Sequence, residues 1–335
     1  MSGNSIEPQV YKTTVLDAGG RYGLHPSWKP FTGELEYFLF EPDPVEAKRL
    51  AAKYSHRSDE VKVIDLAVAE KNGNLTIYFF KNRAMSSAVI RNPVSSLFKG
   101  KRASEVEIVE SIEVEAVSID SFCKINDLSL DFLKLDTEGN EFQILQGAKK
   151  QLKENILGVR CEVAFDYIFE GMPLFSTIHD FMLSEDYYLL NLDYEGRGDY
   201  QSNSVNIKER YGILTHSDAV WMKRPKHLFE SPDRCNGNIE VSVMKYASFL
   251  LNNNAPDVAI DILLRARRDE GLSFESTQES LLYKFLDISV HKLFYNLKWQ
   301  PGQSLVENQN IFQKIFGKKM KTMNDFMESE ELNPD

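Results

Sequence analysis

The chain has 335 residues, of which 42% are hydrophobic, and it carries a formal net charge of −11 at neutral pH. This length and apolar content suffice for one large globular domain or for a domain with a smaller companion. The negative charge argues against a broad nucleic-acid-binding surface, because such surfaces depend on clustered Lys and Arg.

The first predicted element is a short apolar strand that runs into a glycine-rich turn. The strand at 14–18 leads into Gly19, Gly20 and Gly23, and a second strand at 37–40 ends on Glu41. Glycines let the backbone turn sharply and approach a ligand closely. An acid about 20 residues farther on can accept hydrogen bonds from both hydroxyls of a ribose. This pairing predicts a nucleotide site, with an ordinary strand-to-helix connection as the alternative.

The glycine spacing distinguishes between two kinds of nucleotide site. A dinucleotide fingerprint, G-x-G-x-x-G, would need a glycine where Ala18 stands. Asp17, Gly19 and Gly23 instead form D-x-G-x-x-x-G, which resembles the first motif of S-adenosylmethionine (AdoMet) methyltransferases. This resemblance implies that the glycine turn, Gly20 included, lies against the methionine part of the cofactor.

Three features are predicted between the second strand and the middle of the chain. Pro42 and the acid and proline after it open a helix. Strands at 61–69 and 75–80, joined by a turn, predict a β-hairpin. Residues 83–102 are polar without periodicity and predict a long loop, and loops of that length are usually functional or disordered.

Strands and helices alternate in the next hundred residues. Strands are expected at 114–120, 131–136, 156–163, 187–192 and 219–222, with helices at about 141–152 and 174–183. This alternation predicts an α/β fold with a mostly parallel sheet covered on both faces. Ligands of such sheets bind at the carboxyl ends of the strands, where Asp17, Glu41, Asp136 and Glu162 are all predicted to stand.

Residues 10–224 resemble the FkbM-type AdoMet-dependent methyltransferase family. The most specific match is F-L-K-L-D-T-E-G at 132–139 with Glu141, which resembles that family's F-[IL]-K-[IL]-D-x-E-G-x-E signature. The segment F-E-P-D-P at 40–44 resembles its F-E-P-x-P. The resemblance implies a seven-stranded, Rossmann-like methyltransferase sheet, mostly parallel with the last strand antiparallel. It also implies AdoMet as cofactor, with Asp17, Gly19, Gly20, Gly23, Glu41, Pro42 and Asp136 as cofactor-binding candidates, and a hydroxyl on a saccharide or small metabolite as methyl acceptor.

Transfer of a methyl group from a sulfonium requires the acceptor oxygen to be aligned and its proton removed. The candidate bases are Asp136 and Glu138 first, then Glu162 and His25. No His or Cys metal cluster is predicted. Converging carboxylates would equally suit a divalent cation that polarises the acceptor, and the sequence leaves this alternative open.

From about residue 226 the chain becomes helical, with amphipathic helices at 239–251, 256–268, 277–295 and 308–327. We therefore divide the chain into a methyltransferase domain, 1–225, and a helical C-terminal extension, 226–335. The extension is expected to cover the cleft, to stabilise the sheet domain or to pair with a second copy in a homo-oligomer.

Several classes of protein are disfavoured because the sequence lacks their characteristic features. No run of 18 apolar residues occurs, and the first residues lack a basic segment followed by an apolar one, so we expect no membrane span and a cytoplasmic protein. The three cysteines, Cys123, Cys161 and Cys235, lack C-x-x-C spacing, so neither a disulfide framework nor a zinc site is predicted.

Two rival functions stay open beside the methyltransferase. An NAD-dependent dehydrogenase or epimerase is disfavoured by Ala18 and by the lack of a Tyr-x-x-x-Lys pair after the fourth or fifth strand. A non-catalytic module that recruits a partner through its helices is disfavoured by the intact Asp17, Gly19, Glu41 and Asp136.

Overall fold

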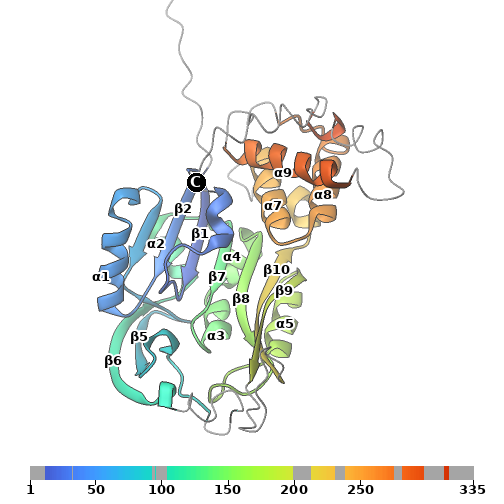
Figure 1. Cartoon of the computed structure of the whole chain (residues 1–335). Coiled ribbons are helices and arrows are strands. Elements are labelled where there is room, and N and C mark those ends of the chain that lie inside the picture. Colours follow the sequence, from blue (N-terminus) through green and yellow to red (C-terminus); the bar gives the residue numbers. More distant parts are fainter. Residues whose placement is uncertain are drawn as a thin grey trace, which may run out of the picture. The chain divides into compact units, whose positions relative to one another are not determined.

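The computed structural model describes residues 12–31, 33–92, 95, 104–198, 213–230, 238–274, 281–297 and 313–316. These residues fall into two compact units (Figure 1). The first unit spans residues 12–227 and contains both sheets. The helices after residue 228 belong to the second unit.

Seven strands of the first unit form the main sheet, in the order β3-β2-β1-β7-β8-β10-β9. Their bounds are β1 (Thr13–Ala18), β2 (Leu35–Phe40), β3 (Val61–Ile64), β7 (Phe132–Leu135), β8 (Gly158–Ala164), β9 (Tyr187–Gly198) and β10 (Ile213–Lys223). The first five of these strands in spatial order are parallel, and β10 is antiparallel to both of its neighbours, β8 and β9. The predicted α/β sheet, mostly parallel with its last strand antiparallel, is confirmed.

Helices and short 3-10 turns connect these strands. The helices of this unit are α1 (Pro44–Lys53), α2 (Ile119–Asn126), α3 (Glu141–Gln146), α4 (Lys149–Glu154) and α5 (Phe175–Ser184), and the 3-10 turns are η1 (Pro26–Phe31), η2 (Ser55–Arg57) and η3 (Arg83–Met85). Helix α6 (Lys226–Glu230) begins in this unit and ends in the second. Asp43 caps α1, accepting a 3.0 Å hydrogen bond from the Val45 backbone N–H. Ser118 caps α2, a helix that the sequence analysis did not predict. A single predicted helix after the signature is divided at Gly147, where an added Cβ would lie 2.6 Å from the Ala69 carbonyl.

The sheet buries side chains on both faces. Alternate residues of its central strands, with Leu16, Leu133 and Val159 among them, form one continuous core with α2, α3, α4 and α5. On the opposite face the Trp28 ring packs 5.5 Å from Phe132, centroid to centroid. This double burial explains why the strands read as apolar runs rather than as alternating ones.

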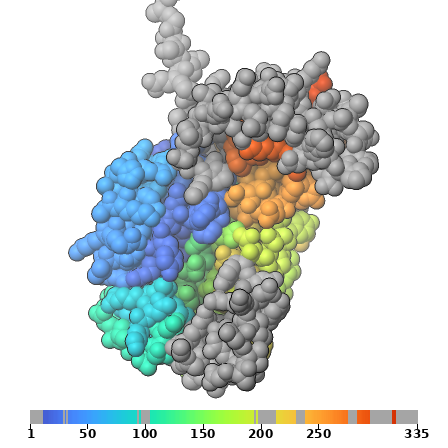
Figure 2. All heavy atoms as spheres, in the orientation of Figure 1, coloured from blue at the N-terminus to red at the C-terminus, as the bar shows by residue number. Residues whose placement is uncertain are grey.

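A second sheet of three strands, in the order β4-β6-β5, follows β3 in the chain. Its strands are β4 (Ala67–Val68), β5 (Gly73–Phe80) and β6 (Ile108–Val117). The predicted hairpin of 61–69 with 75–80 is wrong, because β3 joins the main sheet while β5 pairs antiparallel with β6, far along the chain. The apolar run 61–69 is interrupted at Asp65 and Leu66, so that its two halves belong to different sheets. Figure 2 shows this region, in cyan to teal, lying against the blue surface of the first strands and α1.

The second unit is helical in its described residues, with α7 (Ile239–Asn252), α8 (Pro256–Arg268) and α9 (Leu281–Leu297). Helix α7 is buried along most of its length, from Val241 to Leu250, and packs against α8 and α9. Of the helix predicted at 308–327, only 313–316 lie among the described residues, and these are helical. No helix in the described ranges is both long and apolar enough to span a membrane. Cys123 and Cys161 are free and buried, and Cys235 lies outside the described residues.

Candidate active site

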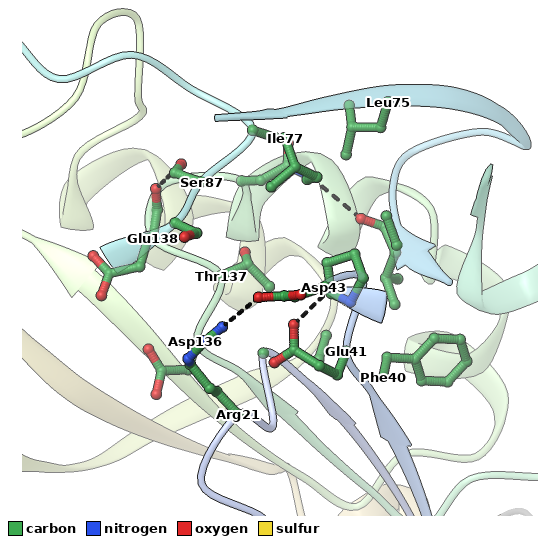
Figure 3. A pocket seen from close by; sticks show the side chains of 18 of the residues that line it. Arg21, Phe40, Glu41, Asp43, Leu75, Ile77, Ser87, Asp136, Thr137 and Glu138 are labelled. Carbon is green, nitrogen blue, oxygen red and sulfur yellow. Dashed lines mark hydrogen bonds and ion pairs between the residues drawn. The ribbon is translucent and has the colours of Figure 1, made fainter. Parts of the chain in front are cut away.

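A cavity of about 650 Å³ opens at the carboxyl ends of β1, β2 and β7. Three segments that are distant in sequence form its polar side: the glycine turn, the residues after β2, and the signature after β7. Its apolar side includes Leu75, Ile77 and Phe79 of β5 (Figure 3). The second sheet therefore forms one wall of a cavity whose polar side comes from segments that follow strands of the main sheet.

Glu41 lies in this cavity at the end of β2. The residue is only 5% exposed, and its Oε1 accepts a 2.9 Å hydrogen bond from the Asp43 backbone N–H. Burial raises the pKa of Glu41 to about 7, although that N–H and the nearby Arg21 act to lower it. The carboxyl group is therefore near half-ionisation at neutral pH, and its other acceptor positions face the cavity (Figure 3).

Asp43 connects two arginines that line the same cavity. The guanidinium groups of Arg21 and Arg83 each lie 3.3 Å from its Oδ2. Burial alone would raise the pKa of Asp43, but the Val45 backbone N–H and Arg21 together hold it below its usual value. Arg21 comes from the glycine turn and Arg83 from η3, so this carboxylate links one end of the main-sheet wall to the loop after β5.

Gly19 is the point where the cavity floor leaves no room for a side chain. Its φ is +89°, a left-handed conformation that favours glycine. A Cβ at this position would lie 1.8 Å from the carbonyl oxygen of Asp136 on the neighbouring strand end. The turn after β1 and the signature after β7 are thus packed backbone against backbone.

Asp17 is fully buried beneath this floor and does not line the cavity. Its carboxylate accepts a hydrogen bond from the Tyr37 hydroxyl and forms a 3.1 Å ion pair with the Lys134 ammonium. The same ammonium lies 3.4 Å from Asp136 Oδ2. Burial alone would lower the pKa of Lys134, but Asp17 and Asp136 hold it above its usual value. Lys134 therefore stays charged and holds both carboxylates.

Three acids gather beyond the signature. Asp136, Glu138 and Glu162 each offer an oxygen, and these oxygens lie within 4.8 Å of one another. Burial, reinforced by the neighbouring carboxylates, raises the pKa of Glu138 and of Glu162 well above the usual range. This spacing suits proton exchange, and it would also admit a divalent cation.

A second cavity, of about 380 Å³, adjoins the first at this acid cluster. Glu138 lines both cavities, whereas Glu162 and His216 line only the second. Glu138 has a φ of +60°, and the Ser87 hydroxyl donates a 2.5 Å hydrogen bond to its carbonyl oxygen (Figure 3). The left-handed backbone thus places this side chain between the two spaces.

Residues 24–194, just over half of the chain, match the model of the methyltransferase FkbM domain. The chain belongs to the FkbM methyltransferase family. No curated protein matches the sequence significantly.

Two solved structures resemble this chain over part of their length. A methyltransferase FkbM from Methylobacillus flagellatus KT shares 16% identity at a TM-score of 0.36, over 63% of this chain and 43% of that one. The MTase domain of METTL16 shares 10% identity at a TM-score of 0.31, over 64% of this chain and 60% of that one. The chain therefore spans less than two thirds of either structure.

The predicted site residues of this chain line the first cavity, the second cavity or neither. Gly19, Glu41, Pro42, Asp136 and Glu138 line the first cavity, and Glu162 lines the second. Asp17, Gly20, Gly23 and His25 line neither. An added Cβ would meet the Leu39 side chain at 2.6 Å at Gly20 and the Tyr54 hydroxyl at 2.3 Å at Gly23, so both glycines serve the packing of the turn.

His25 lies near the charged groups of this edge. Burial, together with the positive charges of Lys134 and Arg160, lowers its pKa to about 4, and its Nδ1 lies 2.8 Å from the Ser27 hydroxyl. At neutral pH the imidazole is uncharged and a weak base. Its assignment as a catalytic base stays a prediction, and its basicity favours it less than the carboxyl groups.

Sequence reasoning missed several residues of the site. Arg21, Asp43 and Arg83 were not expected to meet, and β5 was not expected to form a cavity wall. The available signals were the arginine within the glycine turn, Arg21, and the serine pair at 86–87, which also lines the cavity.

The Tyr37 hydroxyl belongs to the buried hydrogen-bond network under the cavity, so removing it should lower the stability of the protein. Tyr37→Phe leaves the Asp17 carboxylate with one donor fewer in a fully buried position. We expect the free energy of unfolding of the variant to be about 1–3 kcal/mol lower than that of the wild type, measured by urea denaturation. The exposed Tyr22→Phe is the matched control and should unfold like the wild type. Equal stability of Tyr37→Phe and wild type would contradict a role for this hydrogen bond.

Proposed function

We propose that this FkbM methyltransferase uses AdoMet to methylate a hydroxyl group of a small molecule. The observation that carries the proposal is the placement of Glu138 and its acidic neighbours between two adjoining cavities. The first cavity has the wall chemistry for a nucleoside cofactor, and the second adjoins it at Glu138, where the acceptor would bind. Methyl transfer requires the cofactor and the acceptor hydroxyl to meet beside a group that takes the proton of the hydroxyl.

The residues of the first cavity fit AdoMet. Glu41 would accept hydrogen bonds from the ribose hydroxyls, as a buried acid at the end of a second strand does in nucleotide-binding sheets. The apolar residues of β5 would contact the adenine, and the turn at Gly19 would lie beside the methionine part. When bound, AdoMet supplies an electrophilic methyl group on a sulfonium.

Glu138 is the carboxylate best placed to act as the base. It lines both cavities, and its burial raises its pKa, which makes its carboxylate a stronger proton acceptor. Asp136 already forms an ion pair with the Lys134 ammonium, 3.4 Å from its Oδ2. Glu162 would receive the proton from Glu138 or share it, since the three carboxylates cannot all be ionised without strong repulsion.

The pKa of Glu41 predicts a pH dependence of cofactor binding. The ionised carboxylate accepts from both ribose hydroxyls, and a pKa of about 7 means that most Glu41 is protonated at pH 6 and ionised at pH 8. We expect AdoMet affinity to rise about tenfold between these pH values, measured by calorimetry. Glu41→Gln should remove this rise, leaving only the titration of the ligand. The same rise in wild type and variant would assign it to another group.

Calorimetry of the purified chain tests the proposed cofactor directly. AdoMet and its demethylated product, S-adenosylhomocysteine, should bind with micromolar or better affinity, and NAD should not bind. Binding of NAD alone would establish the dehydrogenase alternative, and binding of neither would favour a non-catalytic module. The cytoplasmic location, the absence of nucleic-acid partners, homo-oligomerisation through the helices and the boundary at residue 225 all stay predictions.

A further inference from the structure

The second cavity has walls of an unusual composition for a saccharide site. Five of the residues that line it are apolar: Val163, Ala164, Ile168, Phe169 and Met172. Among the described residues, its polar side chains are Glu138, Glu162 and His216. A pyranose would bring several hydroxyls against these walls, and each one buried without a partner costs free energy.

The apolar wall is fixed by the backbone around it. The Asn92 N–H donates to the Ile168 carbonyl at 2.9 Å, and the Glu170 N–H donates to the Ile90 carbonyl at 2.8 Å. The Phe169 N–H lies 3.3 Å from Met172 Sδ. These bonds tie the loop after β8 to the segment after β5, so the wall is held in place before a ligand binds.

Phe169 places this wall beside the acid cluster. A Cβ added at Gly139 would lie 3.1 Å from Phe169 Cδ2, so the ring packs directly on the turn that carries Glu138. On the other side, His216 Nδ1 lies 3.0 Å from the Thr215 hydroxyl, and the ring covers Gly196, where an added Cβ would meet its Cε1 at 2.0 Å. Carboxyl groups and apolar side chains therefore line the same small cavity.

We propose that the methyl acceptor is an alcohol or phenol whose hydroxyl is attached to a compact hydrocarbon group, and that this group binds between Phe169, Ile168 and Met172. The hydrocarbon gains free energy from burial against this wall. Its hydroxyl then lies at Glu138, facing the cofactor cavity. This inference rests on the proposed function and names the substrate class of the same site.

Binding of a small probe to the chain saturated with S-adenosylhomocysteine tests this inference. The probe is 4-fluorobenzyl alcohol, followed by fluorine NMR, and the rival probe is methyl β-D-glucopyranoside, followed by saturation-transfer NMR. We expect the wild type to bind the alcohol and not the glucoside. Met172→Gln keeps the length of the side chain and an acceptor for the Phe169 N–H, and it should weaken alcohol binding about tenfold.

Two further variants control the test. Tyr167→Gln introduces the same side chain at an exposed position of the same loop and should leave alcohol binding unchanged. Ile168→Thr places a hydroxyl in the wall and should weaken binding as Met172→Gln does, which covers the case in which one variant fails to fold. Calorimetry with S-adenosylhomocysteine should give wild-type affinity for every folded variant.

The possible results separate the two proposals. A chain that does not bind S-adenosylhomocysteine overturns the proposed function, and the inference with it. A chain that binds S-adenosylhomocysteine but binds the glucoside more tightly, or binds no alcohol, overturns the inference alone. Alcohol binding that is unchanged in both wall variants would place the alcohol elsewhere and would likewise overturn it.

Discussion

Glu138→Gln should lower the rate of methyl transfer by roughly 10²–10⁴, the usual contribution of a general base. The amide keeps the size of the side chain and the left-handed backbone of residue 138, but it cannot take the acceptor proton. Burial is no obstacle to folding of the variant, because a neutral amide costs less to bury than a carboxylate beside two others. The measurement is single-turnover transfer of labelled methyl from AdoMet to an identified acceptor.

Controls separate loss of the base from loss of the site. S-adenosylhomocysteine should bind Glu138→Gln within about twofold of its wild-type affinity, since the reaction step and not the cofactor is affected. Glu170→Gln, at an exposed position that lines neither cavity, should keep the wild-type rate. A near-normal rate in Glu138→Gln would move the assignment to Asp136 or Glu162, to be tested as Asp136→Asn and Glu162→Gln.

A chelator distinguishes the base from a metal ligand in the same cluster. If Asp136, Glu138 and Glu162 act through proton transfer, EDTA leaves the wild-type rate unchanged. If they hold a divalent cation, EDTA abolishes the rate and added Mg²⁺ or Mn²⁺ restores it. Restoration of the rate by a metal would therefore contradict the assignment of Glu138 as a simple base.

Glu41→Ala should weaken AdoMet binding about 10²- to 10⁴-fold. Two hydrogen bonds to an ionised carboxylate contribute roughly 1.5–3 kcal/mol each, and water replaces them only in part. Folding should be little affected. Burial raises the pKa of Glu41, which means that the ligand-free protein does not stabilise the ionised carboxylate. Calorimetry gives the affinity, and thermal unfolding at pH 8 gives the stability.

Glu36→Ala is the matched control for that experiment. Glu36 stands on the same strand, β2, but pairs with Lys62 at 2.6 Å and does not line the cavity. Its substitution should leave AdoMet affinity unchanged. If Glu41→Ala also binds AdoMet normally and melts like the wild type, Glu41 is not the ribose partner.

The sequence by itself determined that the main sheet is mostly parallel and which residues stand at the carboxyl ends of several of its strands. Strands alternating with helices require parallel pairing, and the carboxyl ends of parallel strands meet at one edge. Glu41 and the signature acids Asp136 and Glu138 therefore had to be neighbours, although nearly a hundred residues separate the two segments. Local pattern and parallel geometry were enough for this part.

Only the tertiary structure decided which side chains face the cavities. Asp17 stands at a strand end like Glu41, yet it is turned under the floor, where Lys134 and Tyr37 hold it. Strand periodicity fixes which face of the sheet a residue lies on, but not what the facing layer places opposite it. The contacts of Asp17 depend on β2 and β7, which no local pattern at residue 17 can specify.

The strand pairing of the second sheet could not be predicted from the sequence for a related reason. An apolar strand next to a turn predicts a hairpin, because short loops are the commonest connection between antiparallel strands. The actual partner of β5 is β6, and residues 81–107 lie between them. Pairing over such a distance depends on the burial that the whole fold offers to both strands. That pairing places Leu75, Ile77 and Phe79 in the wall of the first cavity, and the hydrogen bonds between the loops after β5 and β8 hold the wall of the second cavity.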